Sequence, residues 1–472
     1  MIADLKPYAE YKESGLPWLG QVPGHWELKR TKSSVANIVE QTSQMNSDDI
    51  YVALENIESW TGHVRPQQGE HLFTGQVKRF RRNDVLFGKL RPYLAKVTRL
   101  QSEGVCVGEL FVLRPRDGSI CSEFLEQQLR AKHTIDIVNS STFGAKMPRA
   151  DWQFVGNLSL VFPPSDEQAA IVRFLDWANG RLERAIRAKR KVIALLGEQK
   201  QAIIHRAVTR GLDPSVPLKP SGIPWLGDIP QHWEVVALGR LCVSRCDGPF
   251  GSGLKSAHYT DSGVRVIRLQ NIGSGEYRAR DGAFISAEHY ATLGDHGVIE
   301  GDLLVAGLGD EKIPAGRACV APRDLGPSMV KADCFRFRMI GGQVVVQFIA
   351  AQLSATAAGA TACLSTGATR LRINLSASAA RSVAIPPAAE QQEILTSIDR
   401  AVAPLIRTIS RLEREIELLR EYRTRLVADL VTGKLDVRQA SAHLPDEALP
   451  EMTEDDTDLA DEAVAPEEEA IV

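Results

Sequence analysis

The sequence predicts an α+β fold that is internally duplicated, with two globular domains separated by two long helices that pair as a coiled coil. Three observations lead to this prediction. A tryptophan-containing motif occurs twice, a long heptad pattern follows each copy, and the intervening segments alternate short apolar runs with turn residues. We therefore expect a short motif, a variable region and a long helix, and then the same three parts again.

The repeated motif is the strongest sign of duplication. Residues 14–26 read SGLPWLGQVPGHW and residues 221–233 read SGIPWLGDIPQHW, with nine of 13 positions identical at an offset of 207. Chance does not supply such a match, so the chain contains two related halves.

A second pair of segments matches at an offset of 223: FPPSDEQAAIVRFLD from Phe162 and IPPAAEQQEILTSID from Ile385. Proline tolerates a helix start but not a helix interior, so each Pro-Pro pair should end a strand and leave a helix to begin after it. The difference between the offsets places about 16 extra residues in the second variable region.

Both expected helices carry a heptad seam, which favours coiled-coil pairing over a surface helix. At 1.5 Å per residue, a helix of about 40 residues spans roughly 60 Å. Two matching helices in one chain favour pairing within the chain, and the alternative is a dimerisation arm between chains. The predicted seam comprises Leu175, Leu182, Ile186, Ile193, Leu196, Ile203, Ile398, Leu405, Ile409, Leu412, Ile416, Leu419 and Leu426.

The segments between motif and helix read as strands joined by turns, with short helices around Ser122 to Ile137 and Val344 to Ser354. Each should fold as a compact α+β domain. The expected order is a motif segment 1–26, a first domain 27–162, a first helix 163–212, a linker with the second motif 213–233, a second domain 234–385, a second helix 386–438 and an acidic tail 439–472.

Charge is distributed unevenly along the chain. The formal net charge is −3, yet residues 445–472 carry twelve Asp and Glu and no Lys or Arg. The rest of the chain has 56 basic against 47 acidic residues, a net charge of +9. Such an acidic block is typical of a solvated, disordered tail, and the alternative is a nucleic-acid mimic that competes for the basic surface.

Composition also indicates the compartment. Seven cysteines form no framework of a small disulfide scaffold, and the close pair Cys242 and Cys246 lacks two further ligands for a metal. We find neither a signal peptide nor an apolar run of about 20 residues, so we expect a soluble, cytoplasmic protein without membrane contact.

The variable regions contain many basic and amide side chains, which favours a nucleic-acid ligand. Lys and Arg neutralise phosphates, and Arg and Gln reach base edges. The alternative is a solvated face without a ligand. The candidates for DNA contact are Lys78, Arg79, Arg81, Arg82, Lys89, Arg91, Lys146 and Arg149 in the first region and Lys255, Arg268, Gln270, Lys312, Arg317, Arg370 and Arg372 in the second.

Catalytic motifs are missing from the sequence. There is no G-x-x-x-x-G-K-[ST] phosphate loop, and Gly307-x-Gly309 is not completed to a dinucleotide fingerprint. No tetrapeptide suited to holding a flipped adenine occurs, and Asp310-Glu311-Lys312 lacks the upstream carboxylate of a nuclease. We predict no catalytic, cofactor-binding or metal-binding residue in this chain.

The sequence resembles the specificity subunits of Type I restriction-modification systems over about residues 11–438. The resemblance is carried by P-W-L-G-x-x-P-x-H-W, by P-P-x-x-E-Q at 163–168 and 386–391, by GDLLV from Gly301, and by the loops STFGAKMPR from Ser141 and STGATRLR from Ser365. The acidic tail has no counterpart in this pattern.

The resemblance implies two target-recognition domains, each reading one half of a bipartite, asymmetric site in double-stranded DNA. It implies that the helices are antiparallel, fix the spacer length and dock two modification (methyltransferase) subunits, with restriction subunits completing the complex. S-adenosylmethionine, ATP and Mg²⁺ would then act in those partners, and this chain would be a non-catalytic reader. Two alternatives remain: a coiled-coil protein-interaction adaptor without DNA readout, and an enzyme with an unrecognised site.

Overall fold

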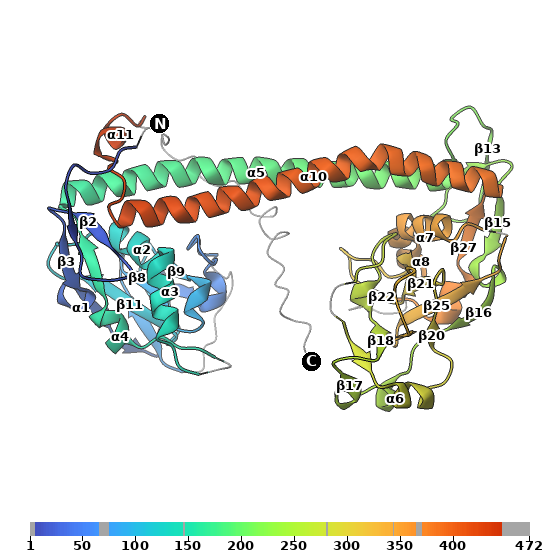
Figure 1. Ribbon diagram of the computed structural model, residues 1–472, viewed down its shortest axis with the longest axis horizontal. Helices are drawn as coiled ribbons and strands as arrows, with labels where there is room; N and C mark the ends of the chain where they lie inside the picture. Colours follow the sequence, from blue (N-terminus) through green and yellow to red (C-terminus); the bar gives the residue numbers. More distant parts are fainter. Residues whose placement is uncertain are drawn as a thin grey trace. The chain divides into compact units, whose positions relative to one another are not determined.

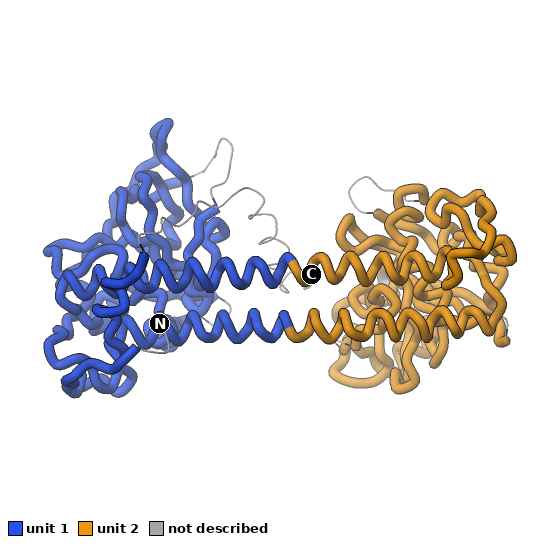
Figure 2. Tube along the Cα trace, turned by 90° about the horizontal axis from the view of Figure 1, so that it is seen from above, with its two compact units in different colours: residues 1–191, 412–472 blue, residues 192–411 orange. Residues whose placement is uncertain are grey.

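The computed structural model describes residues 5–65, 75–144, 147–279, 282–342, 344–364 and 371–445. The chain divides into two compact units, Met1–Lys191 with Leu412–Val472 (unit 1) and Val192–Arg411 (unit 2), as coloured in Figure 2. Both units mix helices and strands, so the fold is α+β, as predicted (Figure 1). The predictions for Lys146, Arg370 and most of the acidic tail lie outside the described residues.

Two long helices contribute to both units: α5 (Ser165–Arg210) and α10 (Ala388–Val431). Each begins directly after a Pro-Pro pair. Proline lacks an amide hydrogen, and this is tolerated at a helix start because the first N–H groups of a helix have no acceptor within it. Within unit 1 the helices run antiparallel, because Glu183 of α5 pairs with Arg423 of α10 and Lys189 pairs with Glu415, at 2.5 Å in both cases. The second helix ends at Val431, earlier than the predicted boundary, and a short α11 (Arg438–Ala442) follows.

The predicted seam residues are all buried or half-buried. α10 continues through Pro404, which the sequence register did not consider; the ring lies on an exposed position, where one lost main-chain donor is tolerated. The buried seam residues are Leu175, Leu182, Ile186, Ile398, Ile416 and Leu426, and the half-buried ones are Ile193, Leu196, Ile203, Leu405, Ile409, Leu412 and Leu419.

Unit 1 contains two four-stranded sheets, ordered β5-β7-β10-β6 and β4-β11-β8-β9, and the two-stranded pairs β1-β2 and β12-β3. Its strands are β1 (Tyr11–Glu13), β2 (Gln21–Pro23), β3 (Glu27–Arg30), β4 (Val35–Ile38), β5 (Gln41–Thr42), β6 (Ile50–Val52), β7 (Val77–Phe80), β8 (Val85–Gly88), β9 (Val97–Arg99), β10 (Gly104–Cys106), β11 (Leu110–Pro115) and β12 (Ser159–Phe162). Its short helices are α1 (Thr31–Ser34), α2 (Ser122–Arg130), α3 (Lys132–Ser140) and α4 (Trp152–Asn157).

Unit 2 contains a four-stranded sheet, β16-β25-β21-β23, a five-stranded sheet, β17-β19-β18-β24-β20, and the pairs β13-β14, β15-β27 and β22-β26. Its strands are β13 (Leu218–Pro220), β14 (Asp228–Pro230), β15 (Glu234–Ala237), β16 (Cys242–Cys246), β17 (Tyr259–Thr260), β18 (Val264–Ile267), β19 (Phe284–Ile285), β20 (Gly297–Val298), β21 (Leu303–Ala306), β22 (Leu308–Gly309), β23 (Ala318–Val320), β24 (Ser328–Val330), β25 (Cys334–Met339), β26 (Leu371–Arg372) and β27 (Ser382–Ile385). Its short helices are α6 (Ala287–Thr292), α7 (Val346–Ala355), α8 (Ala357–Leu364) and α9 (Leu375–Ala380).

The two units repeat one strand topology. The sheet β4-β11-β8-β9 corresponds to β16-β25-β21-β23, and the parallel pair β10–β6 corresponds to β24–β18. In both units the strand after the motif pairs with the strand before the long helix, as β3 with β12 and β15 with β27. Unit 2 adds β17 and β19 beside β18, within the longer second variable region.

Each repeated motif is anchored to the start of a long helix by its tryptophan. Trp26 and Trp233 are fully buried, and their indole groups donate to Glu167 and Glu390 at 2.9 and 3.0 Å. These acceptors are the glutamates of the two P-P-x-x-E-Q segments, so the two repeated sequence patterns bind each other.

The residues after α10 pack against the N-terminal motif in unit 1. Asp436 donates its main-chain N–H to the carbonyl of Lys6 at 2.8 Å. Gly433 has φ +76°, and a Cβ there would lie 2.3 Å from Pro23, so only glycine fits this turn. In unit 2 the end of α5 is linked through the chain to the second motif, which follows it in sequence. In unit 1 the end of α10 and the first motif are far apart in sequence and are joined only by non-covalent contacts.

Candidate nucleic-acid interface

In unit 1, the end of strand β8 is joined to two loops by main-chain hydrogen bonds. Lys89 donates to the carbonyl of Glu109 at 2.8 Å, and Ala150 donates to the carbonyl of Lys89 at 2.9 Å. A β-bridge between Leu90 and Arg149 holds the same loops together. We call this arrangement the strand junction; it brings three predicted candidates, Lys89, Arg91 and Arg149, to one place.

Unit 2 contains the same strand junction at the end of β21. Gly307 donates to the carbonyl of Asp333 at 2.7 Å, and Ile373 donates to the carbonyl of Gly307 at 2.8 Å. Leu308 of β22 pairs with Arg372 of β26, in the register that Leu90 and Arg149 have in unit 1. The loops STFGAKMPR and STGATRLR therefore end in equivalent arginines.

Each junction pairs its arginine with a carboxylate. Arg149 Nη2 lies 3.2 Å from Glu109 Oε1, and Arg372 Nη2 lies 2.8 Å from Asp333 Oδ1. The arginine side chains remain 52% and 48% exposed, so both guanidinium groups are accessible to a ligand.

Exposed apolar side chains lie near both junctions but differ between the units. The unit 1 loops carry Tyr93, Phe143 and Met147, all exposed. In unit 2, Phe250 is exposed, and the Cζ atom of Arg372 lies 5.8 Å from the centroid of the Phe250 ring. Aromatic and apolar groups beside cations suit contact with bases as well as with phosphates.

Two predicted DNA contacts were wrong. Lys78 is 9% exposed and donates to the carbonyl of Leu110 at 2.7 Å, and burial lowers the pKa of its ammonium. Arg317 is 5% exposed and donates to four carbonyl oxygens, with burial lowering the pKa of the guanidinium. Both side chains donate hydrogen bonds to buried main-chain carbonyl oxygens of their own domains. Without them these carbonyls would lack a donor.

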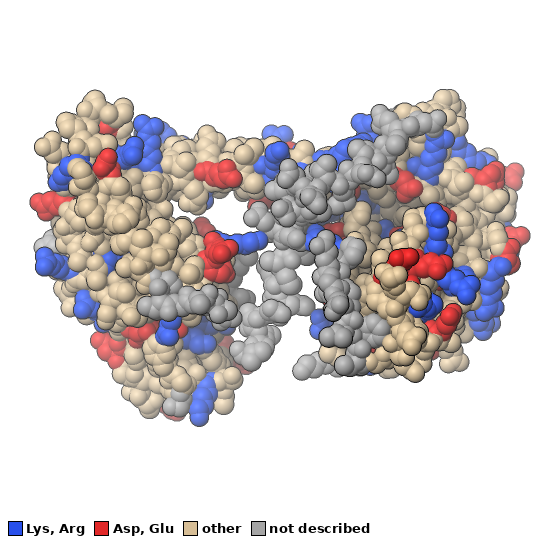
Figure 3. All heavy atoms as spheres, turned by 180° about the vertical axis from the view of Figure 1, so that it is seen from behind, with Lys and Arg blue, Asp and Glu red and all other residues tan. Residues whose placement is uncertain are grey.

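The remaining described candidates lie outside the two junctions or at their edges. Arg79 pairs with Asp49 at 3.0 Å and is 20% exposed, and Arg268 is half-buried. The exposed candidates are Arg81, Arg82, Lys255, Gln270 and Lys312. Figure 3 shows Lys and Arg interspersed with Asp and Glu on the face that it presents, so charge alone does not mark an interface on that face.

Two matched bidentate contacts, one in each unit, were not among the sequence predictions. Arg114 donates Nε and Nη2 to the two oxygens of Asp84, and Arg338 does the same to Asp302. The hydrogen bonds to the buried carboxylates raise the pKa of both arginines. The signal was present as an aspartate directly before each buried strand, in Asn83-Asp84 and Gly301-Asp302.

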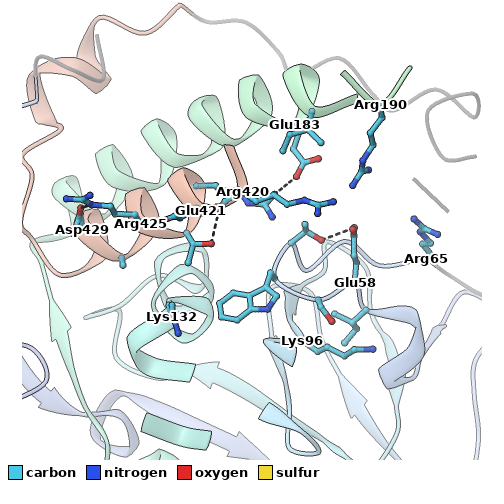
Figure 4. A pocket seen from close by; sticks show the side chains of 18 of the residues that line it. Glu58, Arg65, Lys96, Lys132, Glu183, Arg190, Arg420, Glu421, Arg425 and Asp429 are labelled. Carbon is cyan, nitrogen blue, oxygen red and sulfur yellow. Dashed lines mark hydrogen bonds and ion pairs between the residues drawn. The ribbon is translucent and has the colours of Figure 1, made fainter. Parts of the chain in front are cut away.

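Unit 1 also contains a cavity of about 1120 Å³ between the turn Leu54–Asn56, the loop after it, and facing parts of α5 and α10 (Figure 4). Groups of both signs line it, and Glu183 is already paired with Arg423. Burial and the charge of Arg420 lower the pKa of Arg190 in this wall. The sequence did not single out this cavity.

The described residues contain no cluster of three His, Cys, Asp or Glu that could hold a metal ion. All seven cysteines are free thiols, and burial raises the pKa of Cys106 and Cys319 to about 12. No helix in the described parts of the chain is long and apolar enough to cross a membrane.

No family model matches this sequence. The chain is 23% identical over 207 residues to the Type I restriction enzyme MjaVIII specificity subunit of Methanocaldococcus jannaschii, covering 44% of this chain and 46% of that protein. It is also 23% identical over 209 residues to the Type I restriction enzyme EcoDI specificity subunit of Escherichia coli, covering 43% and 46%. The chain thus matches about half the length of each relative.

A solved structure reported as the structural basis underlying complex assembly and conformational transition of the type I R-M system has a similar fold. The TM-score is 0.60 at 18% identity, over 87% of this chain and 98% of that chain. Together with the sequence matches, this likeness confirms the resemblance to Type I specificity subunits that the repeated motifs indicated.

Proposed function

We propose that this chain is the DNA-sequence specificity subunit of a Type I restriction-modification complex. The observation that carries the proposal is the repeated strand junction: two domains of one topology present equivalent arginines beside different apolar neighbours. Two modules that share a framework and differ at the surface suit two different half-sites on one DNA.

In this proposal the two target-recognition domains, about 27–162 and 234–385, each bind one half of a bipartite, asymmetric site. α5 and α10 form the antiparallel coiled coil that sets the spacer and docks two modification subunits. Restriction subunits complete the complex, and S-adenosylmethionine, ATP and Mg²⁺ are bound by those partners. This chain itself reads DNA and catalyses no step.

The comparisons do not favour the alternative of a coiled-coil adaptor without DNA readout, because the matched relatives are specificity subunits. An adaptor also gives no reason for equivalent exposed arginines at both junctions.

The experiment uses the full chain co-purified with its modification subunit. Mapping methylated adenines in the host genome identifies the target, and electrophoretic shift at several salt concentrations compares that target with a duplex whose half-sites are scrambled. We expect sequence-specific binding with a steep salt dependence. Equal binding of target and scrambled DNA, or no binding, contradicts the proposal. The chain alone, given S-adenosylmethionine or ATP with DNA, should show no turnover.

A further inference from the structure

We propose that Arg149 and Arg372 are equivalent anchors for DNA phosphate groups, one in each recognition domain. They bind the backbone of each half-site without reading its bases. This inference rests on the proposed function, because its ligand is DNA.

The main chain holds both arginines in place before any ligand binds. The amide of Arg149 donates to the carbonyl of Phe143 at 3.2 Å, and a β-bridge joins Arg149 to Leu90. Arg372 lies in strand β26, paired with Leu308. Since these backbones are already ordered, only the side chain has to be fixed on binding, which lowers the entropy cost of the contact.

Both side chains combine accessibility with a preset direction. About half of each guanidinium side chain is exposed, and one carboxylate fixes its orientation: Glu109 for Arg149 and Asp333 for Arg372. Arg149 Nη2 contacts one oxygen of Glu109, and Arg372 contacts one oxygen of Asp333 through Nε and Nη2. Since a guanidinium forms charge-assisted N–H bonds to phosphate as well as to carboxylate, these groups suit phosphate binding.

The repetition itself favours the backbone over the bases. Phosphates are the same in every half-site, whereas base edges differ. The junction and its arginine recur in both domains, but their exposed neighbours do not. Phe143 and Tyr93 lie on the unit 1 loops, whereas in unit 2 Phe250 lies against Arg372 and Ile313 follows β22. A feature common to two readers with different surfaces should serve the chemistry that their targets share.

The test measures the DNA affinity of the complex with its modification subunits for Arg149→Ala and Arg372→Ala, on target and scrambled DNA, over a range of salt. We expect the Kd of each alanine variant to rise about tenfold, and to rise by the same factor on target and on scrambled DNA. The slope of log Kd against log salt should decrease by about 0.9 for each lost phosphate contact. Arg149→Lys should keep the slope, because it keeps the point charge.

The control is Arg323→Ala, which removes an arginine of unit 2, the unit that contains Arg372; its side chain is 82% exposed and paired with Glu300 at 3.0 Å. This variant should leave Kd and slope unchanged. If the salt slope of log Kd is unaltered in both Arg149→Ala and Arg372→Ala, the proposal is overturned. The two arginines would then form only surface ion pairs. A loss of discrimination between target and scrambled DNA also overturns it, because the arginines would then read bases. Failure of the proposed function itself is distinct: the unmodified complex would then show no sequence-specific binding.

Glu109→Gln gives a second, independent readout. The main-chain carbonyl of residue 109 still accepts from Lys89, so the junction remains, while a negative charge beside the phosphate site is removed. The Kd of this variant should fall, with equal effect on target and scrambled DNA. A rise in Kd contradicts the anchor.

Discussion

The indole Nε1 of Trp26 donates a hydrogen bond of 2.9 Å to the buried carboxylate of Glu167, which lies 141 residues further along the chain. The imidazole Nε2 of His25 lies 2.6 Å from the other oxygen of the same carboxylate. Unit 2 repeats the contact between Trp233 and Glu390. The tryptophan motif and the P-P-x-x-E-Q helix start thus contact each other in both units. This contact holds each domain onto its long helix.

Replacing Glu167 with alanine should destabilise unit 1 more than Glu390→Ala destabilises unit 2. Glu167 also accepts from Tyr8 at 3.2 Å and its side chain is 4% exposed, whereas that of Glu390 is 26% exposed. Leaving buried donors without an acceptor costs about 1–3 kcal/mol each, so we expect a loss of about 2–4 kcal/mol against about 1–2 kcal/mol. Hydrogen exchange in urea, read separately for each unit, measures both values, and a larger loss in unit 2 contradicts the ranking.

Replacing Ile416 with aspartate should separate the long helices in unit 1. Ile416 is 6% exposed, and a charge placed there loses its hydration without gaining a partner, so we expect a loss of several kcal/mol and no assembly with modification subunits. Leu412→Asp should have a smaller effect, because Leu412 is half-buried. Light scattering on the purified complex measures assembly, with the exposed Glu413→Asp as the control. Normal assembly of the Ile416 variant would show that docking does not need the helix pair.

Replacing Arg317 with methionine should destabilise unit 2 rather than act only on DNA binding. The guanidinium donates to the carbonyls of Ile272, Leu269, Leu308 and Pro314 at 2.8–3.2 Å. Removing these donors should lower the free energy of unfolding by about 2–4 kcal/mol. Thermal unfolding compared with Arg323→Ala checks this expectation. Equal stability of the two variants is the contrary result.

The Asp247 carboxyl should make unit 2 less stable as pH rises. Burial, together with the neighbouring charge of Asp333, raises its pKa to about 6, against the lowering effects of hydrogen bonds from the main-chain amides of Gly248 and Asp333 and of the charge of Arg372. The folded state therefore binds this proton more tightly than the unfolded state. Its favourable contribution is complete below about pH 4 and is lost as pH rises through about 6. Asp247→Asn should be more stable than the unmodified chain at pH 8, by roughly 1 kcal/mol after allowance for solvent screening, and equally stable at pH 4.

Unfolding midpoints of the two chains across this pH range measure the difference. The amide oxygen of asparagine can still accept from the main-chain amides of Gly248 and Asp333, as Asp247 Oδ1 does at 2.7 and 2.9 Å. A difference that is constant with pH would show that the carboxyl does not titrate there.

The sequence by itself determined the features that depend on local pattern. The two matched motifs, the helix starts after Pro163-Pro164 and Pro386-Pro387, and the heptad register through Ile186 and Ile416 follow from spacing along the chain. Helix periodicity is local, so it can be read without knowing what packs against the helix.

Only the tertiary structure decided which polar groups face solvent. Lys78 and Arg317 are basic residues like Arg149 and Arg372, yet the first two donate to buried carbonyls and the last two stay half exposed. Burial depends on chain segments far away in the sequence, and so does the contact of Trp26 with Glu167. Residue type gives the chemistry of a side chain, and the packing of distant segments decides whether that chemistry serves the core or a ligand.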